Sequence, residues 1–242
     1  MNNNVVIWCI STPNDHLLET AASRLPEHER QRSARFKNTH HAQWWAYVHL
    51  AMRNILGAYT QHATSDLRFQ YSAKGKPSLA IKHEPAIFFN LSHCSDIALL
   101  AVSDCPDLGV DVENVKAMSD MSSVAKHVFS DAEQHYFENL SDLYKVPGFY
   151  KFWTQKESII KANGGGLSLP LDAFDVVGVT SKKWKNIIPK TTHFGLQTYL
   201  TRELCLSEFG LSETHMAAIT FAKQSGEQIP KIKMLTYLPD SF

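Results

Sequence analysis

The 242-residue sequence predicts an α+β fold, because strand-like and helix-like segments recur in both halves of the chain. Short apolar runs and runs of alternating polarity predict strands, whereas apolar residues three and four positions apart predict helices. In chain order, we expect strands near residues 5–10, 67–71, 86–91, 97–103, 109–115, 174–179, 195–201, 216–221 and 231–237, and helices near 15–25, 40–59, 130–140 and 147–162.

Two of these helices have clear local signals. Between residues 40 and 59, Trp45, Val48 and Met52 fall on one side, which is typical of a helix packed against a core. The helix near 130–140 opens with Ser130 followed by Glu133, the capping-box pattern in which each side chain satisfies a backbone N–H of the first turn.

The strand near 109–115 carries two acidic residues in a period-two pattern. Val110 and Val112 alternate with Asp111 and Glu113, so both carboxylates should leave the same face of the strand. Two like charges side by side need a compensating partner.

The helix near 147–162 places a third carboxylate beside its apolar stripe. Glu157 lies four residues after Trp153 and three before Ile160, and a carboxylate in that position is costly unless it is compensated. Lys161, one turn later, shares its side of the helix. The run 163–166, Asn-Gly-Gly-Gly, predicts the end of the helix.

Together these features predict a site for a divalent cation. Three carboxylates that converge on one point repel one another, and magnesium suits a small set of oxygen ligands with room for substrate phosphates. Each piece alone has a simpler reading, since an Asp-x-Glu strand is more often a solvated face and a Glu–Lys pair at i,i+4 is usually a surface pair. The combination with apolar surroundings favours the metal site.

These segments resemble the signature of a known family. The runs 109–113 (GVDVE), 152–161 (FWTQKESIIK) and 166–171 (GLSLPL), with 75–77 (GKP) and 90–93 (NLSH) upstream, resemble the 4′-phosphopantetheinyl transferases, specifically the larger surfactin-type (Sfp-type) group. The resemblance covers roughly residues 24–175.

The resemblance implies an enzyme that transfers the 4′-phosphopantetheine arm of coenzyme A to a serine of an apo carrier protein and releases 3′,5′-ADP. It implies Mg²⁺, or alternatively Mn²⁺, bound by Asp111, Glu113 and Glu157. Glu157 would accept the serine proton directly or through a water, and Lys161 would protonate or steady the departing 3′,5′-ADP.

The resemblance also implies residues that contact coenzyme A. They are Lys76, Pro77, Ser92, His93, Arg32, Arg35, Arg53, Asp111, Lys156 and Lys161. The family commonly carries an Arg between positions 42 and 47 that meets the nucleotide phosphate. This chain has Gln43-Trp44-Trp45 there, so His93 or Arg32 is expected to replace that contact. Without the resemblance, Gly-Lys-Pro is an ordinary turn and Ser-His after a strand an ordinary cap.

For the fold, the resemblance implies two similar α+β halves that form an intramolecular pseudo-dimer, with the active site in the cleft between them. We expect an N-terminal half at 1–105 and a C-terminal half at 106–242 that carries the metal-binding motifs. An apo acyl or peptidyl carrier protein is expected to dock near Met118, Met121 and Val124. Two halves in one chain make a monomer sufficient.

Composition excludes several other classes. Lys plus Arg and Asp plus Glu both total 24, so no nucleic-acid partner is expected. No segment approaches the ~20 apolar residues that cross a membrane, and the first residues lack a secretory signal pattern. The four cysteines form no C-x-x-C pair. We therefore expect free thiols and a cytoplasmic protein.

Two alternatives remain open at this point. Acidic pairs followed by Glu and Lys also mark magnesium-dependent nucleases, although those usually carry Glu-x-Lys on a strand. A non-catalytic scaffold that binds coenzyme A or a carrier protein would share the same signature. The sequence does not identify the carrier, whether of fatty-acid, polyunsaturated-lipid, polyketide or nonribosomal-peptide synthesis.

Overall fold

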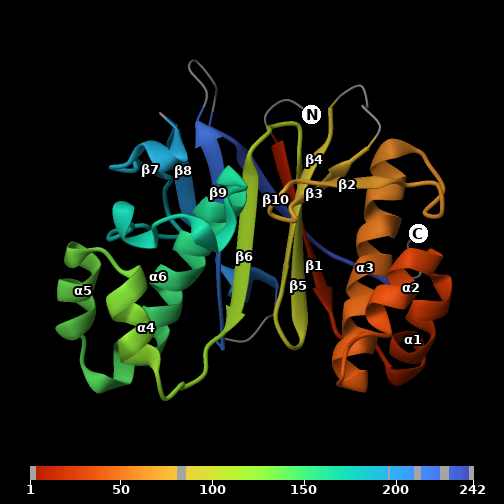
Figure 1. The fold of residues 1–242 in the computed structure, drawn as a ribbon, viewed down its shortest axis with the longest axis horizontal. Helices are drawn as coiled ribbons and strands as arrows, with labels where there is room; N and C mark the ends of the chain where they lie inside the picture. The colour runs from red at the N-terminus through yellow and green to blue at the C-terminus, as the bar shows by residue number, and fades with distance from the viewer. Residues whose placement is uncertain (1–3, 81–85, 196, 210–213, 224–228, 240–242) are drawn as a thin grey trace.

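A computed structural model describes residues 4–80, 86–195, 197–209, 214–223 and 229–239. Two sheets face each other at the centre, and a long helix covers the outer face of each, α3 on one side and α6 on the other (Figure 1). The expected α+β class, with two similar halves, is confirmed.

The first half supplies a helical cluster and the strands of one sheet. Its elements are β1 (Asn4–Ser11), α1 (Asp15–Thr20), α2 (Glu27–Ser33), α3 (Thr39–Thr60), β2 (Phe69–Tyr71), β3 (Pro77–Leu79), β4 (Phe88–His93) and β5 (Ile97–Ser103). The second half supplies β6 (Leu108–Asn114), α4 (Met121–Val128), α5 (Asp131–Glu138), α6 (Asp142–Asn163), β7 (Lys185–Ile187), β8 (Thr198–Glu203), β9 (His215–Lys223) and β10 (Lys231–Thr236).

The last strand belongs to the first sheet. The strand orders are β10-β1-β5-β4 and β6-β9-β8-β7, with β2 and β3 as a separate pair. Strand β10 runs parallel to β1. The hydroxyl of Tyr237, which follows β10, accepts a 2.8 Å hydrogen bond from Asn54 Nδ2 of α3. Strand β10 therefore belongs to the sheet of the N-terminal half, although the expected division assigns all of residues 106–242 to the C-terminal half.

Three apolar clusters hold the layers together. One lies between α3 and the first sheet, and a second packs α6 against the second sheet with α4 and α5. The third fills the space between the sheets, where Ile7 and Leu99 of the first sheet meet Val110, Val112 and Ile219 of the second. The alternation of β6 therefore points its valines between the sheets and its carboxylates toward α6.

Strands β4 and β6 meet as the neighbouring edges of the two sheets. Asn90 Oδ1 accepts a hydrogen bond from Val110 N at 2.8 Å, and Ser92 Oγ accepts one from Val112 N at 3.3 Å. Side chains of β4 thus satisfy backbone donors that an edge strand would otherwise leave unpaired. This contact fixes Ser92 beside Asp111.

The structure differs from the expected elements in a few places. The predicted strand at 174–179 is a loop, because Val176 N bonds Glu133 Oε1 at 2.8 Å and Val177 N bonds Asp175 Oδ1 at 2.7 Å instead of a neighbouring strand. Helix α4 lies between the strand expected near 109–115 and the helix expected near 130–140, where the sequence predicted no element. The capping box at Ser130 and Glu133 is present as predicted.

Two sequence expectations touch residues whose placement is not described. The strand expected at 195–201 is β8, which begins at Thr198, and residue 196 lies outside the described residues. The start of the chain, residues 1–3, also lies outside them. None of the helices in the described ranges is both long and apolar enough to span a bilayer.

Candidate functional site

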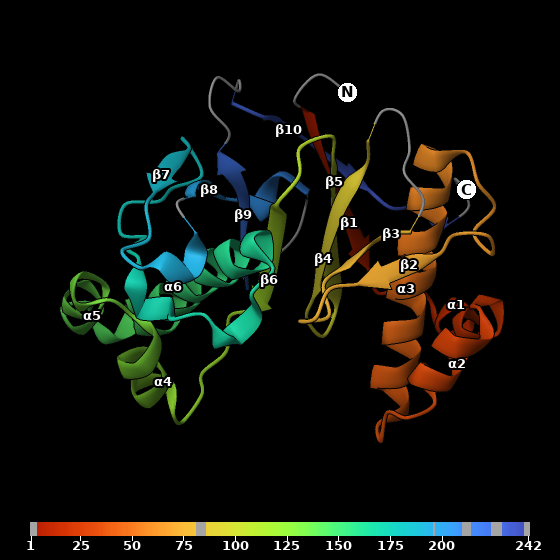
Figure 2. The same ribbon diagram turned by 45° about the horizontal axis from the view of Figure 1, so that its top comes forward.

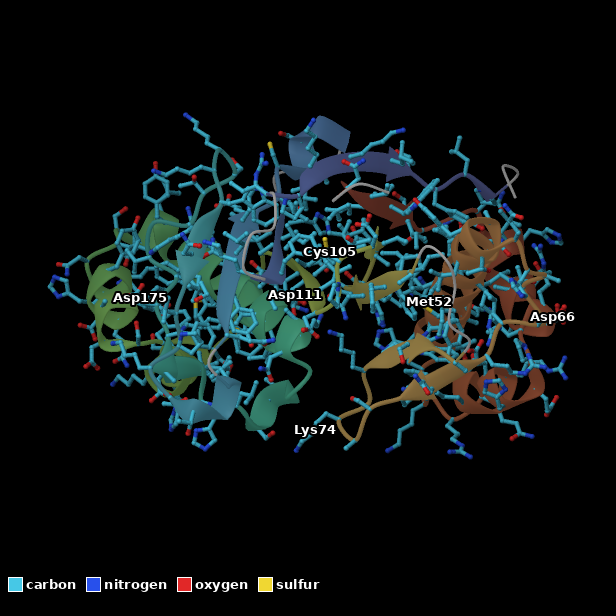
Figure 3. The ribbon with its side chains drawn as sticks, turned by 90° about the horizontal axis from the view of Figure 1, so that it is seen from above. Met52, Asp66, Lys74, Cys105, Asp111 and Asp175 are labelled. Carbon is cyan, nitrogen blue, oxygen red and sulfur yellow. The ribbon has the colours of Figure 1, made fainter. Side chains whose placement is uncertain are left out.

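The site centres on Asp111 in the middle of β6, between the two halves of the molecule (Figure 3). Its side chain is buried, and Oδ1 lies 2.7 Å from Lys161 Nζ and 2.8 Å from Ser92 Oγ. Lys161 Nζ also donates to Ser92 Oγ at 2.8 Å. Strand β4, strand β6 and helix α6 therefore each contribute one side chain to a closed polar triangle.

A glycine allows β6 to approach α6 closely enough for these contacts. A Cβ atom at Gly109 would lie 2.0 Å from Ser158 O and 2.4 Å from Ala162 N, which no side chain tolerates. The end of α6 is equally well defined, because Gly164 adopts φ 83° and donates its N–H to Ile160 O at 2.8 Å. Such a left-handed residue is a common helix end.

The other two predicted carboxylates lie close enough to Asp111 to interact electrostatically with it. Burial raises the pKa of Glu157 to about 7, with a further contribution from Asp111, while Lys161 opposes the shift. Burial also raises the pKa of Glu113, again helped by Asp111, while the Trp153 side chain hydrogen-bonds to this carboxylate. The repulsion expected from the sequence is therefore present.

The carboxylates are suited to a cation but do not form a closed cage. Asp111 Oδ2 and Glu157 Oε1 are buried, and neither has a hydrogen-bond partner among the described residues. Their donor chemistry, carboxylate oxygen with unused lone pairs, fits Mg²⁺. The oxygens of Asp111, Glu113 and Glu157 nevertheless do not all lie within 4.8 Å of one another. Among the described residues, Cys94, Asp96 and His215 are the one group of three potential metal ligands that is this close together.

Lys156 does not belong to this site, which corrects its expected contact with coenzyme A. Its side chain is completely buried, and Nζ lies 2.7 Å from Glu133 Oε2. It also donates to Leu171 O at 2.6 Å and to Phe174 O at 2.9 Å. All three donors of the ammonium are therefore used to attach α6 to α5 and the loop at 171–174.

Arg53 is likewise a structural residue rather than a ligand contact. Its guanidinium is 1% exposed and forms two hydrogen bonds with Glu29, at 2.8 and 3.0 Å. Its third nitrogen donates to Thr64 O at 2.8 Å and Leu67 O at 3.2 Å. The expectation that Arg53 contacts coenzyme A is thus corrected, since the guanidinium is buried and four of its five N–H donors bond within the protein.

Lys76 and Pro77 line an open cleft between the halves. The cleft, of about 470 Å³, is lined by residues of both halves, among them Tyr71, Lys76 and Phe88 from the first and Asn163 and Gly164 from the second. The loop joining β2 and β3, which carries Lys74 and Lys76, reaches toward the end of α6 (Figures 2 and 3). The carboxylates lie beyond the lining, although Leu108 on β6 is part of it.

The position of Lys76 explains how this cleft is held. Nζ donates to Leu108 O and Ala162 O, both at 3.1 Å. Ala162 lies in the last turn of α6, where a cation also interacts favourably with the helix dipole. Burial lowers the pKa of Lys76. Lys76 therefore bridges the two halves and retains one N–H for a ligand.

The basic residues near the start of α3 form a partly stacked group. Arg32 and Arg35 are exposed. The Arg32 guanidinium lies 5.4 Å from the Trp45 ring centroid, and Trp45 stacks on His49 at 3.7 Å. Trp44 is buried and donates Nε1–H to Cys94 O at 2.7 Å. The tryptophans that replace the usual Arg are thus packing residues.

Sequence reasoning missed His49. Its Nδ1 is buried, with no hydrogen-bond partner among the described residues, and burial lowers its pKa to about 3, helped by His93 and Arg32. Burial and Lys161 also lower the pKa of His93, whose side chain is on the exposed end of β4. The only signal for His49 in the sequence was its position one helical turn after Trp45, on the same side of the helix.

The segment expected to bind a carrier protein, residues 118–124, packs largely against the apolar core of the second half. Met121 is 8% exposed, and Met118 and Val124 are partly buried against the same cluster. Tyr150 donates its hydroxyl to Met118 Sδ at 3.9 Å. Met121 is therefore hardly accessible in this structure, whereas Met118 and Val124 retain some exposed surface.

Each half of the chain matches a family model of known proteins. A family model described as the 4′-phosphopantetheinyl transferase superfamily matches residues 107–215. A second model, described as the N-terminal region of a 4′-phosphopantetheinyl transferase, matches residues 10–105. Together the two matches include every residue of the Asp111 site.

Individual relatives show the same similarity. The chain is 33% identical over 171 residues to 4′-phosphopantetheinyl transferase HetI of Nostoc sp., covering 69% of this chain and 72% of that protein. It is 32% identical over 158 residues to 4′-phosphopantetheinyl transferase Sfp of Bacillus subtilis, covering 65% and 68%. It is 26% identical over 219 residues to human L-aminoadipate-semialdehyde dehydrogenase-phosphopantetheinyl transferase, covering 86% and 70%.

Proposed function

The chain belongs to the 4′-phosphopantetheinyl transferase superfamily, and we propose that it transfers the 4′-phosphopantetheine arm of coenzyme A to a serine of an apo carrier protein, releasing 3′,5′-ADP. The observation that carries this proposal is the carboxylate set on β6 and α6, in which Asp111 Oδ2 and Glu157 Oε1 are buried with no hydrogen-bond partner among the described residues. Such a set suits a reaction in which the enzyme mainly positions groups and neutralises phosphate charge.

We propose that Asp111, Glu113 and Glu157 hold Mg²⁺, with Mn²⁺ as the alternative. When bound, the cation would neutralise charge on the diphosphate of coenzyme A and orient it. The three carboxylates would also lose their mutual repulsion, which favours the ionised form of Glu113 and Glu157. The fit is chemical, since both unpartnered oxygens are the hard ligands that this ion prefers.

The proton transfers are assigned to Glu157 and Lys161. A serine hydroxyl is a poor nucleophile until a base accepts its proton. Glu157 is partly exposed, as Glu113 is, and burial raises its pKa to about 7. Lys161 is 28% exposed and keeps one N–H beyond its contacts with Asp111 and Ser92. That donor would steady or protonate the departing 3′,5′-ADP.

The cleft between the halves is the proposed coenzyme A site. Lys76 and Pro77 line it, and Ser92 with His93 lies at the junction of β4 and β6, near Asp111. Because Arg53 and Lys156 are buried and bonded within the protein, Arg32 and Arg35 are the arginines proposed for the phosphates, beside Lys76 and Lys161. Arg32 is the stronger candidate for the 3′-phosphate, since its guanidinium is held against the Trp45 ring.

The partner would be an acyl or peptidyl carrier protein that docks near Met118 and Val124. The neutral formal charge argues against nucleic acid. A cytoplasmic monomer without a membrane partner remains the proposal for location and assembly. The magnesium-nuclease alternative conflicts with the family, whereas a scaffold that has lost activity would retain the fold.

The test is a transfer assay. The full chain is incubated with coenzyme A, MgCl₂ and a panel of apo carrier proteins, and the carrier mass is measured. We expect a mass gain of one phosphopantetheine arm, abolished by EDTA. Binding of coenzyme A with an unchanged carrier mass throughout the panel would support the scaffold instead.

Two variants make the assignment specific. Asp111→Asn keeps an oxygen for Ser92 but removes a charged ligand, and Glu157→Gln removes the base. We expect each to lower the transfer rate at least 100-fold, within the range typical of losing such a group. Glu138→Gln, an exposed carboxylate on α5, is the matched control and should leave the rate unchanged.

A further inference from the structure

A second group of metal-ligand side chains lies where the two halves meet. Cys94 and Asp96 are in the turn between β4 and β5, and His215 begins β9 in the other sheet. Their Sγ, carboxylate oxygen and ring nitrogen all lie within 4.8 Å of one another. The group is separate from the Asp111 site in the fold, because Asn114, which touches it, leaves β6 on the face opposite to Asp111 and Glu113.

The polar contacts of this group cannot all be satisfied by one proton. His215 Nε2 lies 3.0 Å from Asp96 Oδ1 and 2.8 Å from Asn114 Nδ2. Asn114 Nδ2 also lies 3.0 Å from Asp96 Oδ1. If His215 Nε2 carries a proton, two donors face each other, because the Asn114 Nδ2 amide is also a donor. If Nε2 carries no proton, its lone pair faces the oxygen of the Asp96 carboxylate, and the two repel each other.

The orientation of Asn114 is not a free choice that could relieve this conflict. Its Oδ1 accepts from Ser95 Oγ at 2.7 Å and from Ser95 N at 3.3 Å, so Nδ2 must point toward His215. A cation between Asp96 and His215 would resolve the conflict, because both groups would then act as electron-pair donors.

The separations fit a tetrahedral zinc ion. Typical Zn–S, Zn–N and Zn–O bonds of about 2.3, 2.0 and 2.1 Å place sulfur and oxygen ligands about 3.6 Å apart and nitrogen and oxygen ligands about 3.4 Å apart. Cys94 Sγ lies 3.6 Å from Asp96 Oδ1, and Asp96 Oδ1 lies 3.0 Å from His215 Nε2. The third separation, between Cys94 Sγ and a ring nitrogen of His215, is at most 4.8 Å.

The surroundings of His215 and Asp96 match those of a metal site. The other ring nitrogen, Nδ1, lies 3.3 Å from Thr214 Oγ1, and such an outer contact orients a ligating histidine and fixes its tautomer. His215 is 4% exposed, whereas Asp96 is 51% exposed, so a fourth position faces solvent. A thiolate, an imidazole and a carboxylate together suit Zn²⁺ rather than Mg²⁺.

We propose that Cys94, Asp96 and His215 bind one Zn²⁺ ion that fastens the β4–β5 turn of the first half to β9 of the second. The ion would hold β4 beside β6, and hence Ser92 beside Asp111, without taking part in transfer. This site is independent of the proposed function, since either can fail while the other holds.

The test uses the whole 242-residue chain, stripped of metal with a chelator and titrated with Co²⁺ as a spectroscopic probe in excess Mg²⁺. We expect one Co²⁺ per chain with a thiolate-to-cobalt charge-transfer band, displaced by one equivalent of Zn²⁺. Excess Mg²⁺ blocks the carboxylate site on α6 and β6, so that binding there is not counted. Absence of stoichiometric binding would overturn the proposal.

Variants locate the ion. Cys94→Ser should abolish the charge-transfer band, and His215→Gln should weaken Co²⁺ binding at least tenfold. Cys205→Ser, which changes a partly exposed thiol elsewhere, should leave both unchanged. A band that survives Cys94→Ser, or one that Cys205→Ser removes, would refute the assignment.

A second readout guards against misfolded variants. Zinc that binds only the folded chain raises its melting temperature, so we expect a Zn²⁺-dependent increase in the original protein and in Cys205→Ser. Cys94→Ser should melt cooperatively but show no increase. An equal increase in all three proteins would contradict the proposal.

Discussion

Replacement of Lys156 by Met tests whether this residue is a structural ion pair or a coenzyme A contact. Lys156 and Glu133 are both completely buried, with Nζ and Oε2 2.7 Å apart. Met has a similar length and no charge, so Lys156→Met leaves the Glu133 carboxylate buried beside an apolar side chain. The variant also removes the donor that Leu171 O and Phe174 O share.

The size of the effect follows from these contacts. Breaking one side of a buried ion pair costs about 3–5 kcal/mol. Glu133 keeps two backbone donors, Ser130 N and Val176 N, both at 2.8 Å, which favours the lower end of this energy range. The carbonyls of Leu171 and Phe174 lose their donor, which favours the upper end of the range. We therefore expect a loss of about 4 kcal/mol, or roughly 8–16 °C in melting temperature for a chain of this size.

Thermal melts at several pH values, with Lys151→Met as the control, would measure this effect. Lys151 lies on the same helix, is 35% exposed and pairs with Glu203 at 3.2 Å, so its loss should cost less than about 1 kcal/mol. Burial raises the pKa of Glu133 while Lys156 opposes that shift. Without Lys156 the folded-state pKa rises further, so the variant should regain stability as the pH falls and Glu133 becomes protonated.

One result would refute this reasoning. If Lys156→Met melts within 2 °C of the original protein but raises the KM for coenzyme A, the lysine contacts the ligand and the buried pair is not its role. A large loss of melting temperature with an unchanged KM in the surviving folded fraction supports the structural reading.

Three further predictions follow from contacts of the site and the fold. In EDTA, the folded-state pKa of Glu157 is about 7 against an ordinary value of 4.5, so the protein loses stability as the pH rises between these values. Glu157→Gln should therefore have the melting temperature of the original protein at pH 4 and a higher one at pH 8. Equal melting temperatures at both pH values would contradict the shift. Gly109→Ala should fail to fold or melt at least 10 °C lower, since its Cβ would meet Ser158 O at 2.0 Å, whereas Gly75→Ala, with open space around it, should cost only about 1 kcal/mol of backbone strain. Tyr237→Phe leaves the Asn54 amide without its 2.8 Å partner and should cost about 1–2 kcal/mol in urea unfolding; no change would mean that water replaces the hydroxyl.

The sequence alone was sufficient for features that depend on neighbouring residues. The alternation of Val110 and Val112 with Asp111 and Glu113 predicted the two faces of β6, because side chains of a strand alternate. The spacing around Glu157 predicted a carboxylate at the edge of an apolar helix face. Strand and helix periodicities are local, so they can be recognised before the partners of either face are known.

Tertiary structure decided which of the predicted residues are available to a ligand. Lys156 and Arg53 are ordinary cations in the sequence, and only the packing of α5 and α2 against them provides their carboxylate partners, Glu133 and Glu29. Residues that carry a saturated ion pair cannot be distinguished by type or spacing from residues that face a cleft.

Tertiary structure also decided how distant segments meet. Strand β10 pairs with β1 at the other end of the chain, and His215 reaches Asp96 across 119 positions. No local pattern predicts either contact, because each depends on how two sheets pack face to face through their shared apolar cluster. The sequence by itself determined the acidic strand and helix, and the packing of the two sheets determined what surrounds them.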